Sequence, residues 1–571
     1  MPELQVPRPA EALHGADEQT PVTGEEPAAG VSLSAAESRL AIARRWARSH
    51  AIALTGLPLA AIVLFELYLH QARTAPLNGD GAGNALQAWD MLHGNLLLSH
   101  WTVSDVSFYF TELPEYMLVE AVHGLNGDVT HVAAALTYTL AVLLACWLAR
   151  GRARGKEALA RVLIVLVIML SAPGLGVGTV IELDSPDHFG TAVPVLVFFL
   201  ALERLPQRGF TPALLFLVLL WAEASDTTAV FLAGAALTVV TAARLWRGEG
   251  DRRYQAWLLA AAVLSIGIAQ EAPRVINRLG GFAMHSPDMT FNTAAQMPDA
   301  IWKSAGSFLE LFGADFFGLP LATPATGGGQ TVRVSTVIVL LHLIGAGLAV
   351  VALVRTLRRW RGAAAEGDAD GDRIAKLITV GVLFNVAALV LSSQYQGGPR
   401  EIAGVLPLAA VVAARVLGPG LTQRKHIAVL GAAAAMFAAV LVDHAGAASQ
   451  PPYAHKVETW LQQNGYKYGI GGYWTSHSIT VASGGAVQVN PVNTGPKGIS
   501  VYDWESKSTW YDPQAHYADF LVVDVANPLA IKYASPDQAV KQFGPPVRTV
   551  GIGGWEIMIW NKNLLTELAR G

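Results

Sequence analysis

The sequence predicts an all-α polytopic membrane bundle of about eleven transmembrane helices, followed by a small C-terminal α/β domain. Of its 571 residues, 52% are hydrophobic and only 15% are charged, whereas about 25% of the residues in an average soluble protein are charged. Eleven apolar runs approach the length that is needed to cross roughly 30 Å of hydrocarbon. A soluble enzyme and a disordered chain are therefore excluded as descriptions of the whole sequence.

The predicted domains follow from where the apolar runs begin and end. Residues 1–38 are rich in Ala, Glu, Pro and Gly, which predicts a disordered cytoplasmic tail. Residues 39–448 form the predicted transmembrane domain, with long outer loops over 70–130 and 271–334, and residues 449–571 form the predicted outer domain. The predicted spans cover 50–69, 131–149, 159–177, 187–202, 211–224, 227–244, 255–270, 335–354, 376–393, 401–417 and 427–444.

Loop charges predict the orientation. Alternate loops carry 24 Lys and Arg residues, whereas the opposite loops carry 6. Basic loops stay on the cytoplasmic side. The N-terminus is therefore predicted on the cytoplasmic side of the plasma (inner) membrane, and the C-terminal domain on the outer side. The single cysteine, Cys146, excludes an intramolecular disulfide and a cysteine-based metal site.

Local patterns predict several elements outside the spans. Leu113–Leu125 is apolar but too short and too charged to span, so it predicts an interfacial helix with Thr111 as its cap and Pro114 in its first turn. In the outer domain the patterns predict two helices, a buried strand and a pair of strands. These cover His455–Gln463 and Ser535–Phe543 for the helices, Phe520–Asp524 for the buried strand, and Val547–Trp560 for the pair.

Acidic residues gather at the outer ends of the predicted spans. Ionisable groups at membrane depth are costly unless they line a wet cavity, so several on one side indicate a polar pocket. Outer loops also carry carboxylates without a function, and helix capping is an alternative explanation for Ser185–Asp187. The predicted pocket residues are Asp80, Glu112, Glu115, Glu182, Asp184, Asp187 and His188.

Two further groups have more than one interpretation. Arg400 is the only cation of its loop, which makes it a candidate ligand for a phosphate or an interfacial arginine paired with Glu401. The run Asp368–Asp372 has the composition of a solvated linker, and no metal motif is recognisable, so a divalent metal is neither indicated nor excluded. Aromatic residues of the outer domain would either stack on sugars or form its core: Tyr473, Trp474, Trp504, Trp510 and Tyr511.

This arrangement resembles the GT-C membrane glycosyltransferases. It shares with them a cytoplasmic N-terminus, a long first outer loop with Asp80 soon after the first span, a second acidic cluster before the fourth span, and an outer C-terminal α/β domain. The nearer branch is the protein O-mannosyltransferase and aminoarabinose-transferase type, which uses polyprenyl-phosphate sugars. The resemblance implies that Asp80 is the catalytic base or an acceptor ligand. Gly81 stands where the family commonly has the second acid of an Asp-Glu pair.

The sequence leaves three functions open. A glycosyltransferase on the outer face would use a polyprenyl-phosphate sugar from the membrane and a glycan, lipid or protein acceptor, and would not involve nucleic acid. It needs a carboxylate base, for which Asp80 is preferred to Asp90 because Asn78–Gly81 predicts a turn, whereas Ala85–Leu97 reads as an ordinary helix. The alternatives are a transporter or flippase of lipid-linked or anionic cargo, and a noncatalytic glycan-binding membrane protein.

Overall fold

The computed structural model describes residues 55–175, 177–285, 290–314, 334–362, 370–393, 395–495, 497–527 and 532–569. The chain divides into two compact units, Met1–Leu59 and Ala60–Gly571, and all contacts given below lie within the second unit. The predicted tail over 1–38 lies outside the described residues, as do Asp368 and Ala369 of the run Asp368–Asp372.

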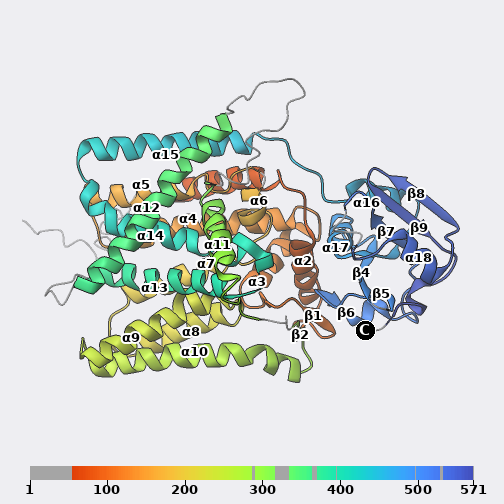
Figure 1. The fold of residues 1–571 in the computed structure, drawn as a ribbon, viewed down its shortest axis with the longest axis horizontal. Coiled ribbons are helices and arrows are strands. Elements are labelled where there is room, and N and C mark those ends of the chain that lie inside the picture. Colours follow the sequence, from red (N-terminus) through yellow and green to blue (C-terminus); the bar gives the residue numbers. More distant parts are fainter. Residues whose placement is uncertain are drawn as a thin grey trace, which may run out of the picture. The chain divides into compact units, whose positions relative to one another are not determined.

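Helices make up most of the described chain before residue 446 (Figure 1). Each of the eleven predicted spans coincides with a helix. Seven described helices are long and apolar enough to cross a membrane, which confirms a polytopic helical protein. They are Thr55–Ala72, α4 (Val129–Arg150), η1 with α9 (Val230–Ala235 and Ala236–Arg247), α10 (Arg252–Arg278), α12 (Val334–Gly362), α13 (Asp370–Leu391) and α15 (Arg424–Ala445).

The four other predicted spans form shorter helices. Of these, α14 is buried at every position and packs against α4, α5, α12 and α13. A helix that is apolar on all sides belongs in the interior of a bundle, so α14 is its central member. The shorter helices are α5 (Gly155–Met169), α7 (Ala192–Arg204), α8 (Thr211–Glu223) and α14 (Val405–Leu417), the last followed by η3 (Gly418–Leu421).

The predicted outer loops fold into shorter elements that pack on the ends of these helices. Predicted as interfacial, the helix α3 spans Glu112–His123 with Pro114 in its first turn, but the Thr111 side chain does not cap it. Thr111 instead donates its hydroxyl hydrogen to the carboxylate of Glu112. The remaining elements are α2 (Gly79–Leu92), β1 (Trp101–Val103), α6 (Val177–Glu182), β2 (Ala283–Met284), α11 (Met297–Leu311) and η2 (Tyr395–Ile402).

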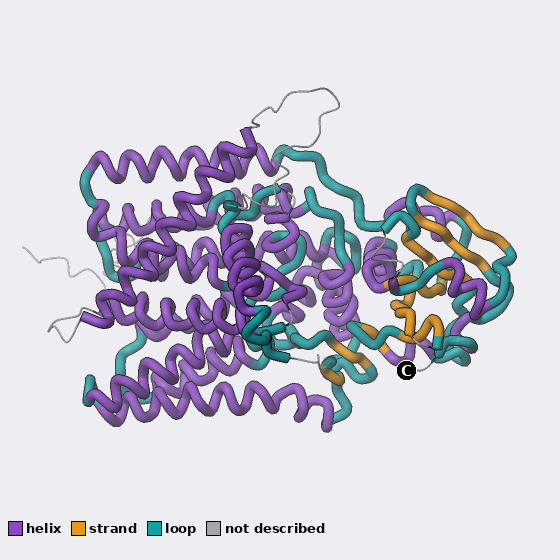
Figure 2. Tube along the Cα trace, in the orientation of Figure 1, coloured by secondary structure: helices purple, strands orange, loops and turns teal. Residues whose placement is uncertain are grey.

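Strands gather in the C-terminal part of the chain, residues 449–569 (Figure 2). Six form a mixed sheet in the order β5-β4-β3-β7-β9-β8, in which β3 is parallel to β4 and β7 and the other pairs are antiparallel. Their bounds are β3 (Tyr468–Gly472), β4 (Gln488–Gly495), β5 (Gly498–Val501), β7 (Phe520–Asp524), β8 (Arg548–Ile552) and β9 (Trp555–Ile559).

Both faces of this sheet are covered. Successive side chains of a strand point to opposite faces, and β7 is buried on both. Leu521 and Val523 pack with α18 (Pro536–Phe543), whereas Phe520 and Val522 pack with α16 (His455–Gln463) and α17 (Tyr473–Ala482). The predicted elements of this part are confirmed, with Ser535 capping α18 by accepting a hydrogen bond from the backbone N–H of Gln538. Two short helices complete the part, η4 (Ser508–Tyr511) and η6 (Leu564–Thr566).

A second, three-stranded sheet joins three segments that are distant in the sequence. Its order is β2-β1-β6, where β6 spans Ser506–Lys507. Residue Thr102 of β1 lies opposite both Ala283 of β2 and Ser506 of β6. Each of the three predicted outer segments thus supplies one strand, so these segments meet.

Candidate active site

The site is built around the first turn of α2. Asn78 caps this helix: its side-chain Oδ1 accepts a hydrogen bond from the backbone N–H of Gly81, with 3.0 Å between N and Oδ1. The predicted turn over Asn78–Gly81 is therefore wrong, because the helix begins at Gly79 and not near Ala85. Asp80 lies in the first turn, where the positive end of the helix dipole favours a carboxylate.

Small residues let other segments approach α2 closely. A Cβ atom on Gly81 would lie 2.9 Å from the Cβ of Ser185, and one on Gly83 would lie 2.1 Å from Oε2 of Glu505. A side chain at either position would force a neighbour to move. The glycines therefore allow the loop before α7 and a loop of the C-terminal part to enclose the beginning of α2.

Asp80 forms an ion pair with Arg400. The Nη1 atom of Arg400 lies 3.0 Å from Oδ2 of Asp80, and its Nη2 atom lies 3.2 Å from Oγ of Ser185. Burial alone would lower the pKa of Arg400, but the negative charges of Asp80, Asp187 and Asp184 outweigh it and raise that pKa. Arg400 is thus held as a cation among three acids, and its ion-pair partner among the described residues is Asp80 and not Glu401, the alternative that the sequence also left open.

The loop before α7 carries Asp184 and Asp187, two of the predicted pocket residues, and contacts the beginning of α2. Asn84 donates to Oδ1 of Asp187 over 3.0 Å, and Asn78 donates to the carboxylate of Asp184. Burial raises the pKa of Asp184 to about 7, against the opposing effect of Arg400, and burial also raises the pKa of Asp187. The helix-capping alternative for Ser185–Asp187 is wrong, because α7 begins only at Ala192.

His188 lies beside this wall in a different set of contacts. Its Nδ1 atom is 3.2 Å from Oδ2 of Asp226, and its Nε2 atom is 4.0 Å from Oε1 of Glu401. Burial opposes protonation, but Glu401 and Asp226 outweigh it and raise the pKa of His188 to about 10. The ring also meets Phe108 edge to face.

Glu112, Glu115 and Glu182 do not contact Asp80. Glu112 accepts a hydrogen bond from the hydroxyl of Thr111, and Glu115 accepts one from the hydroxyl of Thr137 over 2.6 Å. Burial raises the pKa of both, to about 7 for Glu115. Glu182 ends α6 and is buried without a hydrogen-bond partner among the described residues. The predicted pocket acids therefore divide into Asp184 and Asp187, which adjoin Asp80, and three glutamates that are held elsewhere.

Asp90 has a structural environment. Its carboxylate accepts hydrogen bonds from Nζ of Lys507, Nε1 of Trp101 and Nδ2 of Asn95, the first at 2.9 Å. It is therefore not on a solvated helix face, as its position in an ordinary helix suggested, but binds α2 to the C-terminal part.

The aromatic residues of the C-terminal part have separate roles. Tyr511 is buried and donates to the backbone O of Pro491, and Trp510 packs on Trp101. Trp504 packs on His285, and of the five aromatic residues considered in the sequence, Trp474 is the exposed one, at 37%. Core packing thus accounts for Tyr511 and not for Tyr473.

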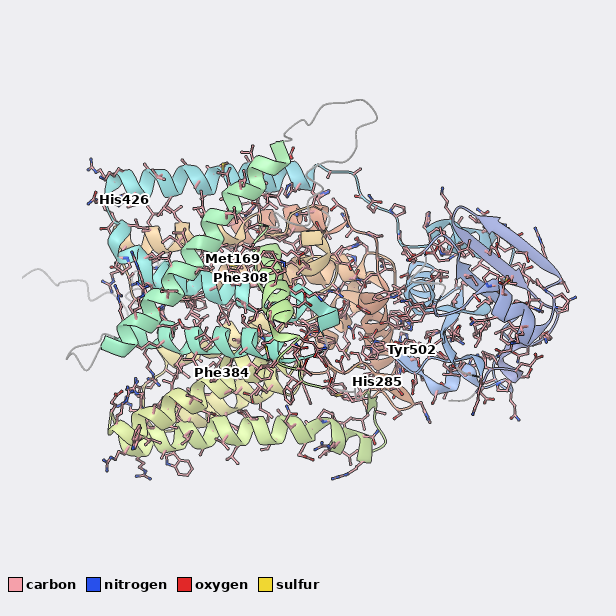
Figure 3. All side chains as sticks on the ribbon, viewed as in Figure 1. Met169, His285, Phe308, Phe384, His426 and Tyr502 are labelled. Carbon is pink, nitrogen blue, oxygen red and sulfur yellow. The ribbon has the colours of Figure 1, made fainter. Side chains whose placement is uncertain are left out.

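Two residues of the C-terminal part complete the site. The hydroxyl oxygen of Tyr473 lies 2.8 Å from Oδ1 of Asp80 and 2.6 Å from Oε2 of Glu505. Tyr473 also meets Tyr502, which Figure 3 labels where the helices adjoin the C-terminal part, with 5.6 Å between ring centroids. Sequence patterns do not mark Glu505 in any way, whereas Asn84 could have been found because it lies four positions after Asp80 on one helix face.

The described residues hold no group of three or more His, Cys, Asp or Glu side chains that is arranged to bind a metal ion. The site's cation is instead Arg400. The arrangement combines three chemical groups. They are a carboxylate at a helix N-terminus, a guanidinium that can bind an oxyanion through two N–H groups, and a tyrosine hydroxyl that is hydrogen-bonded to the same carboxylate.

A scan of the sequence against protein-family models gives no match, and a search of curated proteins also gives none. Several solved structures resemble the chain, and two of them hold a lipid phosphate. The archaeal oligosaccharyltransferase AglB from Archaeoglobus fulgidus, in complex with an inhibitory peptide and a dolichol-phosphate, is 12% identical over 82% of this chain and 69% of its own, with a TM-score of 0.43. ArnT from Cupriavidus metallidurans, bound to undecaprenyl phosphate, is 14% identical over 90% of this chain and 99% of its own, with a TM-score of 0.40. Both are GT-C type glycosyltransferases, which is the resemblance that the sequence predicts.

Proposed function

We propose that this protein is a membrane glycosyltransferase that transfers a sugar from a polyprenyl-phosphate-linked donor to an acceptor on the outer face of the plasma (inner) membrane. The observation that carries the proposal is the ion pair of Asp80, in the first turn of α2, with Arg400, in η2, both outside the candidate spans. It brings together a base for an acceptor hydroxyl and a cation for a phosphate leaving group.

The reaction uses these two groups in one displacement. The acceptor O–H bond breaks and its proton passes to Asp80, while the acceptor oxygen bonds to the anomeric carbon of the sugar. The bond between that carbon and the phosphate oxygen breaks, and its electron pair stays on the polyprenyl phosphate. Arg400 stabilises the negative charge that develops there.

The ion pair also describes a resting state. A donor phosphate would compete with Asp80 for the guanidinium of Arg400, because both are anions that bind its N–H groups. The side chains of Asp80 and Arg400 are 26% and 18% exposed, so the pair is accessible enough for exchange. Donor binding would then release Asp80 for the acceptor.

Two groups of contacts support the proposed orientation. The sheet β2-β1-β6 joins the three segments that are predicted outside. Loops that are predicted inside also contact one another through basic residues. Arg415 pairs with Glu203, with 2.9 Å between Nη2 and Oε1, and Arg204 donates a hydrogen bond to the backbone O of Gly151. Asp80 and Arg400 belong to the predicted outer set.

The alternatives have less support. A transporter would place its charged groups at mid-bilayer, whereas Asp80 lies at the start of α2, outside the candidate spans. A noncatalytic glycan binder would offer several aromatic rings to solvent, whereas Tyr473 and Tyr511 are buried and Trp474 alone of the five candidates is exposed.

The proposal is tested by binding and transfer. Purified protein in nanodiscs is incubated with undecaprenyl phosphate or with undecaprenol, which lacks the phosphate, and examined by native mass spectrometry. We expect selective retention of the phosphate, identification of a polyprenyl phosphate among co-purified lipids, and transfer of label from a lipid-linked sugar pool. Equal binding of the two lipids, without transfer, would contradict the proposal.

A further inference from the structure

The hydroxyl group of Tyr473 lies within hydrogen-bond distance of two carboxyl groups. Its hydroxyl oxygen approaches Asp80 at 2.8 Å and Glu505 at 2.6 Å, and both neighbours are carboxyl groups. A tyrosine hydroxyl has one hydrogen and can donate to only one of them. An ionised carboxylate has no hydrogen to donate in return, so the second contact requires a proton on one carboxyl group.

The surroundings decide which carboxyl group holds that proton. Asp80 lies in an ion pair with Arg400, whose positive charge balances the negative charge of one carboxylate. Glu505 is 2% exposed and forms no ion pair with a Lys, Arg or His side chain among the described residues. Burial raises the pKa of Glu505 well above its ordinary value, and the negative charge of Asp80 raises it further.

Backbone geometry holds Glu505 in this position. Its φ is +47°, in the left-handed region that residues other than glycine rarely adopt. The absence of a side chain at Gly83 leaves the space that the Glu505 carboxyl occupies. Other titratable groups that act on Glu505 or on its two partners are Asp105, Asp184, Asp187, Arg400, His477, Tyr502 and Tyr533.

We infer that Glu505 is a neutral carboxylic acid that positions the base: it donates its proton to the oxygen of Tyr473, and Tyr473 donates its own to Asp80. The inference rests on the proposed function for the role of Asp80, but the proton on Glu505 does not depend on it. Glu505 keeps its proton through turnover, while the proton of the acceptor goes to Asp80. Tyr473 and Glu505 are positioning residues, supplied by the C-terminal part.

The arrangement predicts distinct effects for two substitutions. Glu505→Gln places an amide N–H where the acid has its O–H, so Tyr473 keeps a donor and turnover at neutral pH should fall less than in Glu505→Leu, which has no donor. Tyr473→Phe removes the hydrogen bond to Asp80 and should lower kcat roughly ten- to hundredfold, the worth of one hydrogen bond to a charged group. It should also move the acid limb of the pH–rate profile to higher pH, because the ionised carboxylate has lost a donor.

The alkaline limb carries a second signature. When Glu505 ionises at high pH it becomes an acceptor, draws the Tyr473 hydrogen away from Asp80, and turnover falls. Glu505→Gln cannot ionise, so this part of the alkaline limb should disappear, whereas Glu505→Leu should lose turnover at every pH. Tyr511→Phe is the matched control, because Tyr511 is a buried tyrosine of the same part that bonds to the Pro491 backbone and not to Asp80.

Infrared difference spectroscopy on the full chain tests whether Glu505 is protonated, and this measurement does not depend on sugar transfer. At neutral pH, wild type minus Glu505→Gln should show the C=O stretch of a protonated carboxylic acid, and the band should vanish at alkaline pH. Absence of the band at neutral pH, or a wild-type pH profile in Tyr473→Phe, would overturn the inference. A protein that transfers no sugar but shows the band would contradict the proposed function alone.

Discussion

The guanidinium of Arg400 lies 3.0 Å from the carboxylate of Asp80, although 320 positions separate the two residues in the chain. Neither charge is then free before substrate binds, and each determines how available the other is. The predictions that follow depend on this coupling and on the contacts around it.

Asp80→Asn should lower turnover by roughly two to four orders of magnitude, because the amide keeps the size of the carboxyl group but not its basicity. Affinity for undecaprenyl phosphate should stay the same or increase, since Arg400 has lost the anion that competes with the phosphate. Steady-state kinetics and lipid titration measure the two effects. Asp299→Asn, which removes an exposed charge from α11, is the control. Near-normal transfer by Asp80→Asn would assign the base to another residue.

Arg400→Ala should weaken undecaprenyl phosphate binding about ten- to hundredfold, the worth of hydrogen bonds between charged groups. Arg400→Lys should lose less, because it keeps the charge but not the planar fork of donors. Circular dichroism on both variants establishes that the protein is folded, since Arg400→Ala leaves Asp80, Asp184 and Asp187 without their cation. Equal affinity in wild type and Arg400→Ala would remove Arg400 from the donor site.

Cysteine labelling should place Gly151–Glu157 and residues 363–372 inside the cell, and Asp80, Ser286 and Tyr511 outside. The reason is the distribution of 24 against 6 basic residues between the two sets of loops. Because Cys146 is the only native cysteine, a Cys146→Ser background removes competing label. A cytoplasmic Tyr511 would place the proposed site on the wrong face.

Lys507→Ala should destabilise the protein by roughly 1–3 kcal/mol, because it removes a charge-assisted contact from the half-buried carboxylate of Asp90. Thermal unfolding in nanodiscs measures the change. The control is Lys562→Ala, whose partner Glu567 is 37% exposed, and which should cost less than about 1 kcal/mol. Equal destabilisation by the two substitutions would show that the Asp90 contact has no special weight.

Stability should decrease as the pH rises from about 7 to 10. Burial opposes the charge on His188, but Glu401 and Asp226 outweigh it and raise its pKa from 6.5 to about 10. A raised folded-state pKa gives stability that is complete below the unfolded-state pKa and is lost as the pH passes the folded-state value. His188→Asn, chosen because asparagine tolerates the φ of +62° at this position, should flatten the melting temperature against pH. An unchanged slope would show that His188 does not titrate in this range.

The sequence predicts the helices and the apolar strands well because their signals are local. The predicted bounds of α16 and β7 agree residue for residue with the structure, and every predicted span coincides with a helix. β3 and β4 escape prediction because β3 contains three glycines and β4 contains Pro491, which weaken a strand pattern. The pairing of β3 with β7, and of β4 with β3 and β5, overrides these preferences.

The candidate site is only partly predictable because its contacts are distant in the chain. Asp80, Arg400 and the wall of Asp184 and Asp187 can be proposed from charge and position relative to the spans. Glu505 cannot, since nothing in its neighbourhood distinguishes it from a surface acid until the fold buries it beside Tyr473. The start of α2 is misread because the segment from Asn78 to Gly81 favours a turn, while its glycines are needed for close packing.

The three-stranded sheet β2-β1-β6 and the Tyr473 hydroxyl mean that the protein is not modular at residue 449. Exchanging the C-terminal part for that of another protein would replace β6, the cation that holds Asp90, and both residues that orient Asp80. Such a chimera would keep Asp80 but lose the hydrogen bonds that orient its carboxylate. Because the two parts share these contacts, they should evolve together. A substitution near Asp80 should then be tolerated only with a matching substitution near Glu505.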